Sequence, residues 1–222
     1  MEEKLAEVRS VVDQLGLFDN VSTFYLMVKR LADIFAALFG IIILSPVFLI
    51  TAVLIKFTSH GRIFFIQERN GYKGKIFKMY KFRSMVSDAE KLFDSFESMN
   101  EVSGNMFKIK ADPRITSVGK IIRKTSIDEL PQLFNILKGD MSFVGPRPPI
   151  PREVVKYDAW HNLRLSVKPG LTGLWQISGR SQVGFEEMVR LDLKYIRERS
   201  LLYDFKIIVR TVPVIIWDSK AY

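Results

Sequence analysis

Two adjacent acids, Asp128 and Glu129, stand in the segment KTSIDELPQLFNILKGDMSFVGPRPP, which runs from Lys124 to Pro149. Neighbouring carboxylates repel each other, but they are tolerated where a divalent cation lies between one of them and an anionic substrate. Mg²⁺ binds one or two carboxylates together with phosphate oxygens, and a carboxylate can also act as a nucleophile. The pair is therefore a candidate site for phosphoryl transfer.

A structural role for the acidic pair is the open alternative. Ser126 and Glu129 match a capping box, but a helix capped by Ser126 would place Pro131 at a position that needs an N–H group. A helix that begins at Asp128 avoids this, because Pro131 then falls where the N–H has no helical partner. We therefore expect Asp128 to cap a helix, whose positive end keeps the carboxylate ionised at neutral pH.

Arg147 lies between prolines in VGPRPP. Proline fixes its own backbone and holds the preceding residue extended, so the arginine is presented stiffly. Its guanidinium group matches a phosphate with two hydrogen bonds. A polyproline connector with a solvated arginine is the alternative. Arg123, Lys124 and Arg180 could complete a pyrophosphate pocket, although each could equally be a surface charge.

The composition narrows the class of protein. The chain has 222 residues and a net charge of +9, which suits an anionic membrane, a phosphorylated substrate or nucleic acid. Cys is absent, which excludes disulfides and cysteine-ligated zinc. The two histidines, His60 and His161, are far apart, and we expect surface or core positions for them rather than metal binding.

The excess of positive charge lies in the part of the chain after residue 28. Residues 1–28 carry two basic and five acidic side chains, so their net charge is −3 and the remainder carries +12. Apolar residues recur at helical spacing from Leu5 to Leu15, which predicts a short amphipathic helix. We treat residues 1–28 as an N-terminal extension.

An uncharged, apolar run extends from Ile34 to Ile55. As a helix it reaches roughly 33 Å, against ~30 Å for the hydrocarbon core of a bilayer. Pro46 removes a hydrogen bond, and the Ser45 hydroxyl can satisfy the freed carbonyl, so we expect a sharp bend at Ser45-Pro46. A re-entrant helix and a kinked spanning helix are both alternatives here. The N-terminal segment is acidic and carries little of the positive charge that would retain it on the cytoplasmic side.

The rest of the chain predicts an α+β domain. Alternation around NGYKGK predicts a β-hairpin within residues 61–85. Residues 88–99 resemble an exposed helix, and Asp112-Pro113 predicts a turn. Residues 183–217 are expected to be mostly helical and broken at Pro213, with an apolar face that suits a core or a bilayer surface. The patterns GxGxxG and GxxxxGK[ST] are both absent.

Several segments together resemble the bacterial sugar transferases, the monotopic phosphoglycosyl transferases. They are YKFRSM, DPRIT, RKTSIDELPQLFNILKGDMSFVGPRP and KPGLTGLWQISGR. The resemblance covers about Lys29 to Tyr222, and the long block around the acidic pair is the specific part. Residues 1–28 stand where longer members carry a four-helix bundle and an adjoining domain.

The resemblance implies a reaction and roles for named residues. Such enzymes transfer a sugar-1-phosphate from a UDP-sugar to a polyprenol phosphate and release UMP. The nucleophile of the family falls on Asp128, which forms a covalent aspartyl phosphosugar, and the Mg²⁺ ligand falls on Glu129. The residues that contact phosphate and nucleotide fall on Arg123, Arg147 and Arg180, with a further acid at Asp204.

The resemblance also implies a location and an architecture. We expect a mainly helical α+β monotopic enzyme with a re-entrant membrane helix at 29–56, a small β-hairpin and amphipathic helices on the membrane surface. The catalytic domain, residues 57–222, would lie on the cytoplasmic face of the inner membrane. The reaction would initiate capsule, exopolysaccharide or O-antigen assembly, with undecaprenyl phosphate as acceptor.

Two other readings compete with this one. A membrane-anchored basic module that binds anionic lipid or nucleic acid would explain the charge but not the acidic pair. An ordinary glycosyltransferase would release UDP instead of UMP. We expect membrane lipids as partners and no nucleic acid. GLWQISGRS and the aromatic C-terminus favour a galactose or glucose donor, and the sequence leaves oligomerisation open, a homodimer included.

Overall fold

The computed structural model describes residues 21–89, 109, 112–179 and 183–217, with side chains described up to residue 214. The expected helix at 5–15, residues 90–99 of the expected helix at 88–99 and Arg180 lie outside this part of the chain. The helices are α2 (Thr23–Ile43), α3 (Ser45–Thr58), α4 (Ser117–Lys124), α5 (Gln132–Lys138), α6 (Pro151–Val154), α7 (Leu174–Ile177), α8 (Phe185–Glu198) and α9 (Leu201–Trp217). The strands are β1 (Phe64–Asn70), β2 (Ile76–Phe82), β3 (Ser142–Val144) and β4 (Gly170–Thr172).

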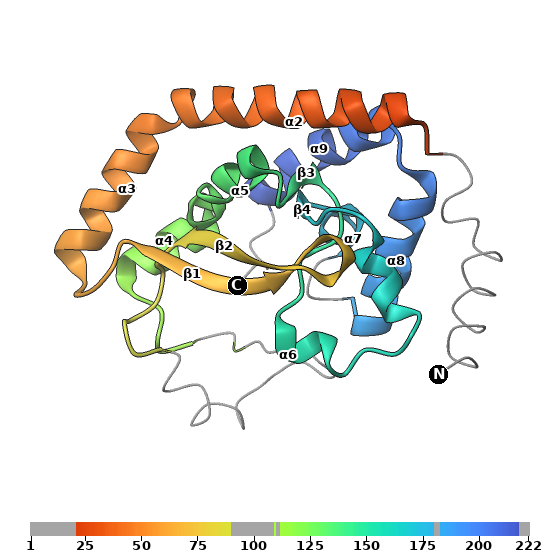
Figure 1. The fold of residues 1–222 in the computed structure, drawn as a ribbon. Helices are drawn as coiled ribbons and strands as arrows, with labels where there is room; N and C mark the ends of the chain where they lie inside the picture. The colour runs from red at the N-terminus through yellow and green to blue at the C-terminus, as the bar shows by residue number, and fades with distance from the viewer. Residues whose placement is uncertain (1–20, 90–108, 110–111, 180–182, 218–222) are drawn as a thin grey trace.

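The expected bend is present between α2 and α3, whose axes differ by 60° (Figure 1). Pro46 lies in the first turn of α3 and cannot donate to the carbonyl of Ile42. The Ser45 hydroxyl donates to that carbonyl at 2.8 Å instead, as the sequence predicts. In the described part of the chain no single helix is long and apolar enough to cross a bilayer, whereas the bent pair meets that test together.

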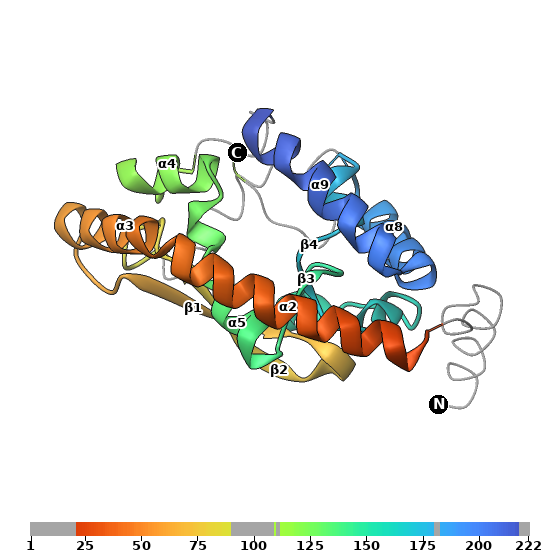
Figure 2. The same cartoon turned by 90° about the horizontal axis from the view of Figure 1, so that it is seen from above.

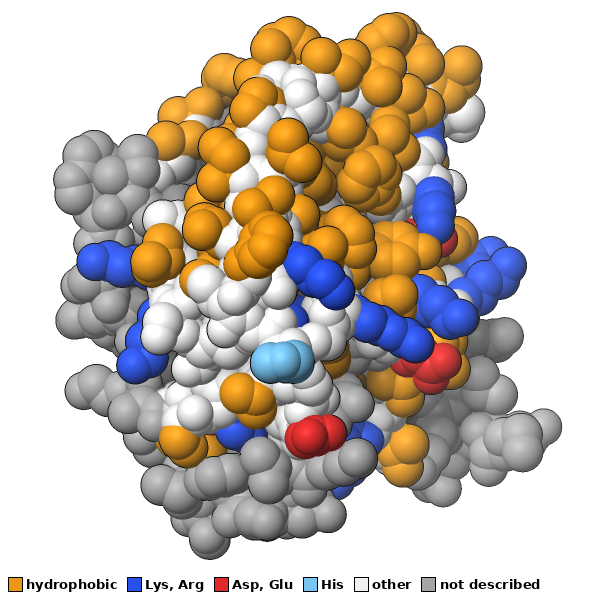
Figure 3. All heavy atoms as spheres, turned by 90° about the vertical axis from the view of Figure 1, so that its left-hand side faces the viewer, with side chains coloured by type: hydrophobic (Ala, Val, Ile, Leu, Met, Phe, Trp, Pro, Cys, Tyr) orange, Lys and Arg blue, Asp and Glu red, His pale blue; other side chains and the backbone are white. Residues whose placement is uncertain are grey.

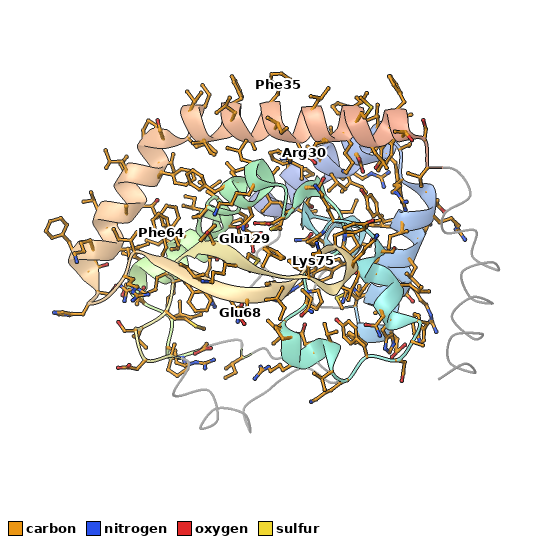
Figure 4. The ribbon with its side chains drawn as sticks, viewed as in Figure 1. Arg30, Phe35, Phe64, Glu68, Lys75 and Glu129 are labelled. Carbon is orange, nitrogen blue, oxygen red and sulfur yellow. The ribbon has the colours of Figure 1, made fainter. Side chains whose placement is uncertain are left out.

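One face of α2 is attached to the rest of the molecule by polar contacts. Lys29 donates to the Val144 carbonyl at 3.1 Å, and Arg30 donates to two carbonyls at the C-terminal end of α5. The buried carboxylate of Asp33 accepts from the hydroxyl of Ser142 and from the next backbone N–H group of β3. Figure 4 shows Arg30 on this inner face and Phe35 on the opposite, outward face.

The outward face of α2 and α3 is apolar and exposed. Phe35, Phe39 and Phe57 leave 68%, 67% and 85% of their surface uncovered. Figure 3 shows hydrophobic side chains gathered over this end of the molecule, with Lys and Arg side chains below them. On α9 the large apolar residues that are exposed include Leu201, Leu202, Phe205, Ile208, Val209 and Val212.

The predicted hairpin is confirmed. β1 and β2 pair antiparallel, with Phe65 opposite Lys81, Gln67 opposite Met79 and Arg69 opposite Phe77. Opposite residues of an antiparallel pair project from the same face, so these six side chains share one face. Met79 on that face is buried in a core cluster with Leu133 and Ile136 of α5.

The second half of the domain packs around a short parallel pair, β3 and β4. Figure 2 shows α8 and α9 on the same side of this pair, and residues of both helices share its core cluster. The predicted break at Pro213 is wrong, because α9 continues to Trp217. Pro213 is exposed, and the chain remains helical despite the hydrogen bond that proline cannot make.

Candidate active site

The acidic pair lies in a 3₁₀ turn, Ile127–Glu129, between α4 and α5. The predicted helix start at Asp128 is wrong: α5 begins at Gln132, and Pro131 precedes it, where its missing N–H costs nothing. Ser126 has a left-handed backbone, φ 56°, and its side chain caps no helix. The capping box is therefore not formed, and the turn packs against β2.

The Asp128 side chain is buried, with 4% of its surface exposed. Its Oδ1 atom has no hydrogen-bond partner among the described residues. Burial raises the pKa of Asp128 from 3.8 to about 6, with a smaller contribution from the charge of Glu129, while Lys81 and Arg123 oppose the increase. The expectation that a helix end would favour the ionised form is thus corrected: burial works against it, although most of the carboxylate is still ionised at pH 7.

Lys81 connects the hairpin to the acidic pair. Its Nζ atom donates to Glu129 Oε1 at 2.7 Å. Sequence reasoning quoted the surrounding YKFRSM but did not single out this lysine. The available signal was strand alternation, because Lys81 shares its face of β2 with the buried Met79. Figure 4 shows Glu129 between the hairpin and α5.

α4 brings Arg123 to the same place. Thr116 caps this helix by accepting from Gly119 N at 2.9 Å. A side chain at residue 119 would meet the Ser84 carbonyl at 1.9 Å, so glycine lets α4 pack against the end of the hairpin. Arg123 in the last turn then donates through Nε to the Ser84 hydroxyl at 2.9 Å, and its charge acts on Asp128.

The segment Pro146–Pro149 is held by hydrogen bonds to all four of its carbonyls. The Pro146 and Pro149 carbonyls accept from backbone N–H groups, each at 2.9 Å. The Arg147 carbonyl accepts from Arg164 at 3.3 Å, and the Pro148 carbonyl accepts from Arg69 at 2.9 Å. The stiff presentation predicted for Arg147 is therefore found, and its side chain is exposed.

Arg147 and Glu129 both act electrostatically on the buried Arg69 side chain. The guanidinium carbon of Arg147 lies 5.9 Å from the centre of the Trp175 ring. The charges of both Arg147 and Glu129 influence the pKa of Arg69, so Arg69 lies within electrostatic reach of both. Direct interactions thus bring Asp128, Glu129 and Arg123 together, whereas Arg147 is linked to them through Arg69.

Asp204 has a different setting. Its carboxylate accepts from Tyr25 at 3.0 Å, from Lys29 at 2.8 Å and from Tyr195 at 2.8 Å. These partners lie on α2 and α8, whereas the residues that interact with Asp128 lie on β2, α4 and the 3₁₀ turn. The geometry gives Asp204 a structural task, joining α2, α8 and α9. Its predicted contact with substrate stays a prediction.

The metal-binding capacity of the site is limited to the two carboxylates. Within the described residues, no group of three or more His, Asp or Glu side chains could hold a metal ion. Mg²⁺, however, is commonly bound by one or two carboxylates plus substrate phosphates and water. The unpartnered Asp128 Oδ1 and the adjacent Glu129 match that smaller requirement.

Comparison with known proteins gives the same assignment across most of the chain. The family model described as bacterial sugar transferase matches residues 24–218. The chain is 49% identical over 198 residues to the galactosyl transferase CpsE of Streptococcus agalactiae, covering 89% of this chain and 44% of that protein. It is 41% identical over 198 residues to the exopolysaccharide production protein ExoY of Sinorhizobium fredii, covering 87% and 88%.

A third relative names an acceptor. The undecaprenyl-phosphate galactose phosphotransferase of Salmonella typhimurium is 42% identical over 199 residues, which cover 87% of this chain and 41% of that protein. The chain thus spans less than half the length of two of these relatives and most of the third. With the family model matching nearly its full length, the chain belongs to the bacterial sugar transferase family of enzymes.

Proposed function

We propose that the protein transfers a sugar-1-phosphate from a UDP-sugar to undecaprenyl phosphate and releases UMP. The single observation that carries the proposal is the buried Asp128 carboxylate beside Glu129, Lys81 and Arg123, whose Oδ1 atom has no hydrogen-bond partner among the described residues. The names of relatives support the acceptor and the donor class, since they include an undecaprenyl-phosphate galactose phosphotransferase and a UDP-galactose-lipid carrier transferase.

Asp128 is the nucleophile of the proposed reaction. A carboxylate oxygen attacks the β-phosphorus of the donor, and the bond from that phosphorus to the bridging oxygen breaks, so UMP leaves with both electrons. The resulting aspartyl phosphosugar is then attacked by a phosphate oxygen of the polyprenol phosphate. The Asp128–phosphorus bond breaks, the carboxylate is regenerated and a polyprenyl diphosphate sugar is formed. Each step is nucleophilic displacement with covalent catalysis.

Glu129 would hold Mg²⁺ together with the phosphates of the donor. Bound there, the ion would withdraw charge from the phosphate oxygens. Lys81 neutralises Glu129 at 2.7 Å and favours the ionised, reactive form of Asp128. Its position lets the same ammonium group screen the approaching donor from both acids.

The arginines bind the donor. Arg123 lies next to the acidic pair, and exposed Arg147 offers a planar fork of donors to phosphate. We assign Arg180 to the same task on the family resemblance alone. For Asp204, the proposed contribution to substrate binding is secondary to its buried contacts with α2 and α8.

The apolar outer face of α2 and α3 is proposed to enter the cytoplasmic leaflet of the inner membrane and to return to the same side. The 60° bend and the exposed phenylalanines support this arrangement. α9 adds further exposed apolar residues, which suits an amphipathic helix lying on the membrane surface. The lipid acceptor and the soluble donor would then meet at the membrane boundary.

The donor sugar is proposed to be galactose or glucose. GLWQISGRS supports this choice, and relatives carry galactose and glucose in their names. A relative named for N-acetylgalactosamine makes UDP-N-acetylgalactosamine the necessary comparison donor. The proposed pathway is exopolysaccharide or capsule synthesis, in keeping with the relative ExoY, which is named for exopolysaccharide production.

The released nucleotide tests this proposal. Purified protein is incubated with Mg²⁺, undecaprenyl phosphate and each of the three UDP-sugars, and the nucleotide product is identified by chromatography. We expect UMP. Release of UDP would identify an ordinary glycosyltransferase, and no release with any donor would favour the non-catalytic basic membrane module.

A further inference from the structure

Arg69 is a buried arginine on β1 that sequence reasoning did not identify. Only 7% of its surface is exposed. One guanidinium nitrogen donates to the Pro148 carbonyl at 2.9 Å, and another donates to Gln67 Oε1 at 2.6 Å. Its Nε atom is buried and has no hydrogen-bond partner in the part of the chain that the structure describes. The group therefore touches the residue that follows Arg147 and still has an unused donor.

The charge around Arg69 is incompletely balanced. Burial, followed by the neighbouring charge of Arg147, lowers the pKa of Arg69 from 12.5 to about 9, and Glu153 and Glu129 only partly oppose this. Arg164 holds the preceding carbonyl in a similar way, but it forms a direct ion pair with buried Asp192. Among the described residues, Arg69 has no such direct carboxylate partner.

A purely structural role does not require a cation at this position. A neutral amide could donate to the Pro148 carbonyl without the cost of burying a charge next to Arg147. A buried, unbalanced cation is stabilised when an anion binds beside it. Arg147 is exposed next to the segment that Arg69 holds, so an anionic ligand against Arg147 would offset the repulsion between the two groups.

We propose that Arg69 is a positioning residue for the donor: it fixes Arg147 through the Pro148 carbonyl, and the two arginines together form a subsite for the diphosphate of a nucleoside diphosphate sugar. This inference rests on the proposed function. It assigns Arg69 two effects on donor binding, one through the geometry of the segment Pro146–Pro149 and one through charge.

The test compares wild type with Arg69→Gln, which keeps a hydrogen-bond donor and loses the charge. The ligands are UDP-galactose with Mg²⁺ and, separately, inorganic pyrophosphate. We expect the variant to raise the KM for UDP-galactose about tenfold or more, the effect of losing one charge-assisted interaction, with a smaller change in kcat. The increase in melting temperature that each ligand causes in wild type should be largely lost.

Arg30→Gln is the matched control. Arg30 also donates to two backbone carbonyls, at 2.6 and 2.8 Å, but these belong to α5. The control should lower the melting temperature of the ligand-free protein while the ligand-induced increase is kept. A ligand-induced increase that Arg69→Gln retains in full, with an unchanged KM, would overturn the inference.

Two further variants keep the test decisive. If Arg69→Gln is not recovered folded, Arg69→Lys replaces it. Lysine keeps the charge but lacks the planar guanidinium group, so a raised KM for UDP-galactose supports the inference. An unchanged KM contradicts it. In the double variant Arg69→Gln with Arg147→Gln, the increase in KM should be smaller than the product of the single increases. An increase equal to that product would show that the two arginines act independently.

The proposed function and this inference fail in different ways. If none of UDP-galactose, UDP-glucose and UDP-N-acetylgalactosamine stabilises wild type, the donor class is wrong and the inference fails with it. If a UDP-sugar stabilises wild type and Arg69→Gln equally, the proposed function stands and only the role of Arg69 is rejected.

Discussion

The Lys81 ammonium group lies 2.7 Å from the Glu129 carboxylate and is also the strongest positive influence on Asp128. One lysine thus forms an ion pair with Glu129 and lowers the pKa of Asp128. It reaches them from the hairpin, across a sequence separation of nearly fifty residues. The ionisation of Asp128 is therefore influenced from β2 as well as from its own turn.

Asp128→Asn is expected to abolish transfer, because an amide cannot form the proposed acyl phosphate. Incubation with donor alone should add the mass of a hexose phosphate to wild type and not to the variant, as measured by intact-protein mass spectrometry. Since burial opposes ionisation of Asp128, the neutral variant should be at least as thermally stable as wild type at pH 8. Near-normal turnover would rule out the covalent mechanism.

The pH dependence of donor consumption should follow the raised pKa of Asp128. Only the carboxylate is nucleophilic, so kcat/KM should fall below about pH 6, whereas an ordinary aspartate would stay active to near 3.8. Lys81→Met removes the cation that lowers this pKa, so the acidic limb should move to higher pH. A limb that stays in place or moves to lower pH would contradict the assignment of Lys81.

Glu129→Gln is expected to reduce the rate by a large factor that added Mg²⁺ partly restores, because the amide binds the ion less well. The measurement is the Mg²⁺ concentration at half-maximal rate. Glu198→Gln is the control, since Glu198 interacts with Arg197 and Tyr203 at the C-terminal end of α8, and neither residue belongs to the candidate site. An unchanged Mg²⁺ dependence in Glu129→Gln would remove the metal role.

Lys29→Met should destabilise the protein by about 3 kcal/mol, because it leaves the buried Asp204 carboxylate without its cation. Combining it with Asp204→Asn should recover part of that loss in thermal denaturation. If Asp204 also contacts the donor, Asp204→Asn should raise the donor KM while Lys29→Met does not. Equal KM values in both variants would leave Asp204 with its structural task alone.

The bend at Ser45-Pro46 should keep both ends of the α2–α3 pair on one side of the membrane. The chain has no Cys, so Ser10→Cys can be probed alone with an impermeant thiol reagent. Labelling should occur only after cells are permeabilised. Adding Pro46→Leu removes the break, and we expect a labelled fraction in intact cells. Labelling of intact cells without that substitution would mean that the pair spans the membrane.

Local patterns were enough to predict the bend and the hairpin. Each of these depends on a few neighbouring residues, such as Pro46 with Ser45 or the alternation around residues 71–75. The resemblance added the reaction, because the chemistry of two adjacent carboxylates does not by itself select one.

Long-range contacts explain what sequence reasoning missed. Lys81 and Arg69 lie on the inner face of the hairpin, but their partners come from segments far along the chain. The predicted helix cap at Asp128 failed because Ser126 takes a left-handed backbone, which delays the helix to Gln132. Burial of Asp128 raised its pKa, where sequence reasoning expected the ionised form to be favoured. That burial depends on packing between β2, α4 and α5, which local patterns do not reveal.

The contacts of Lys29, Arg30 and Asp33 with β3, α5 and α9 have a consequence for bilayer thickness. A spanning helix must match the thickness of its membrane by tilting or by deforming the lipid. A helix pair that is attached to its domain and returns to one leaflet has no far end to match. In the proposed orientation, the height of Asp128 above the lipid headgroups is fixed by protein contacts. A phosphate carried on a long prenyl chain would therefore meet the carboxylate at the same depth in thin and thick membranes.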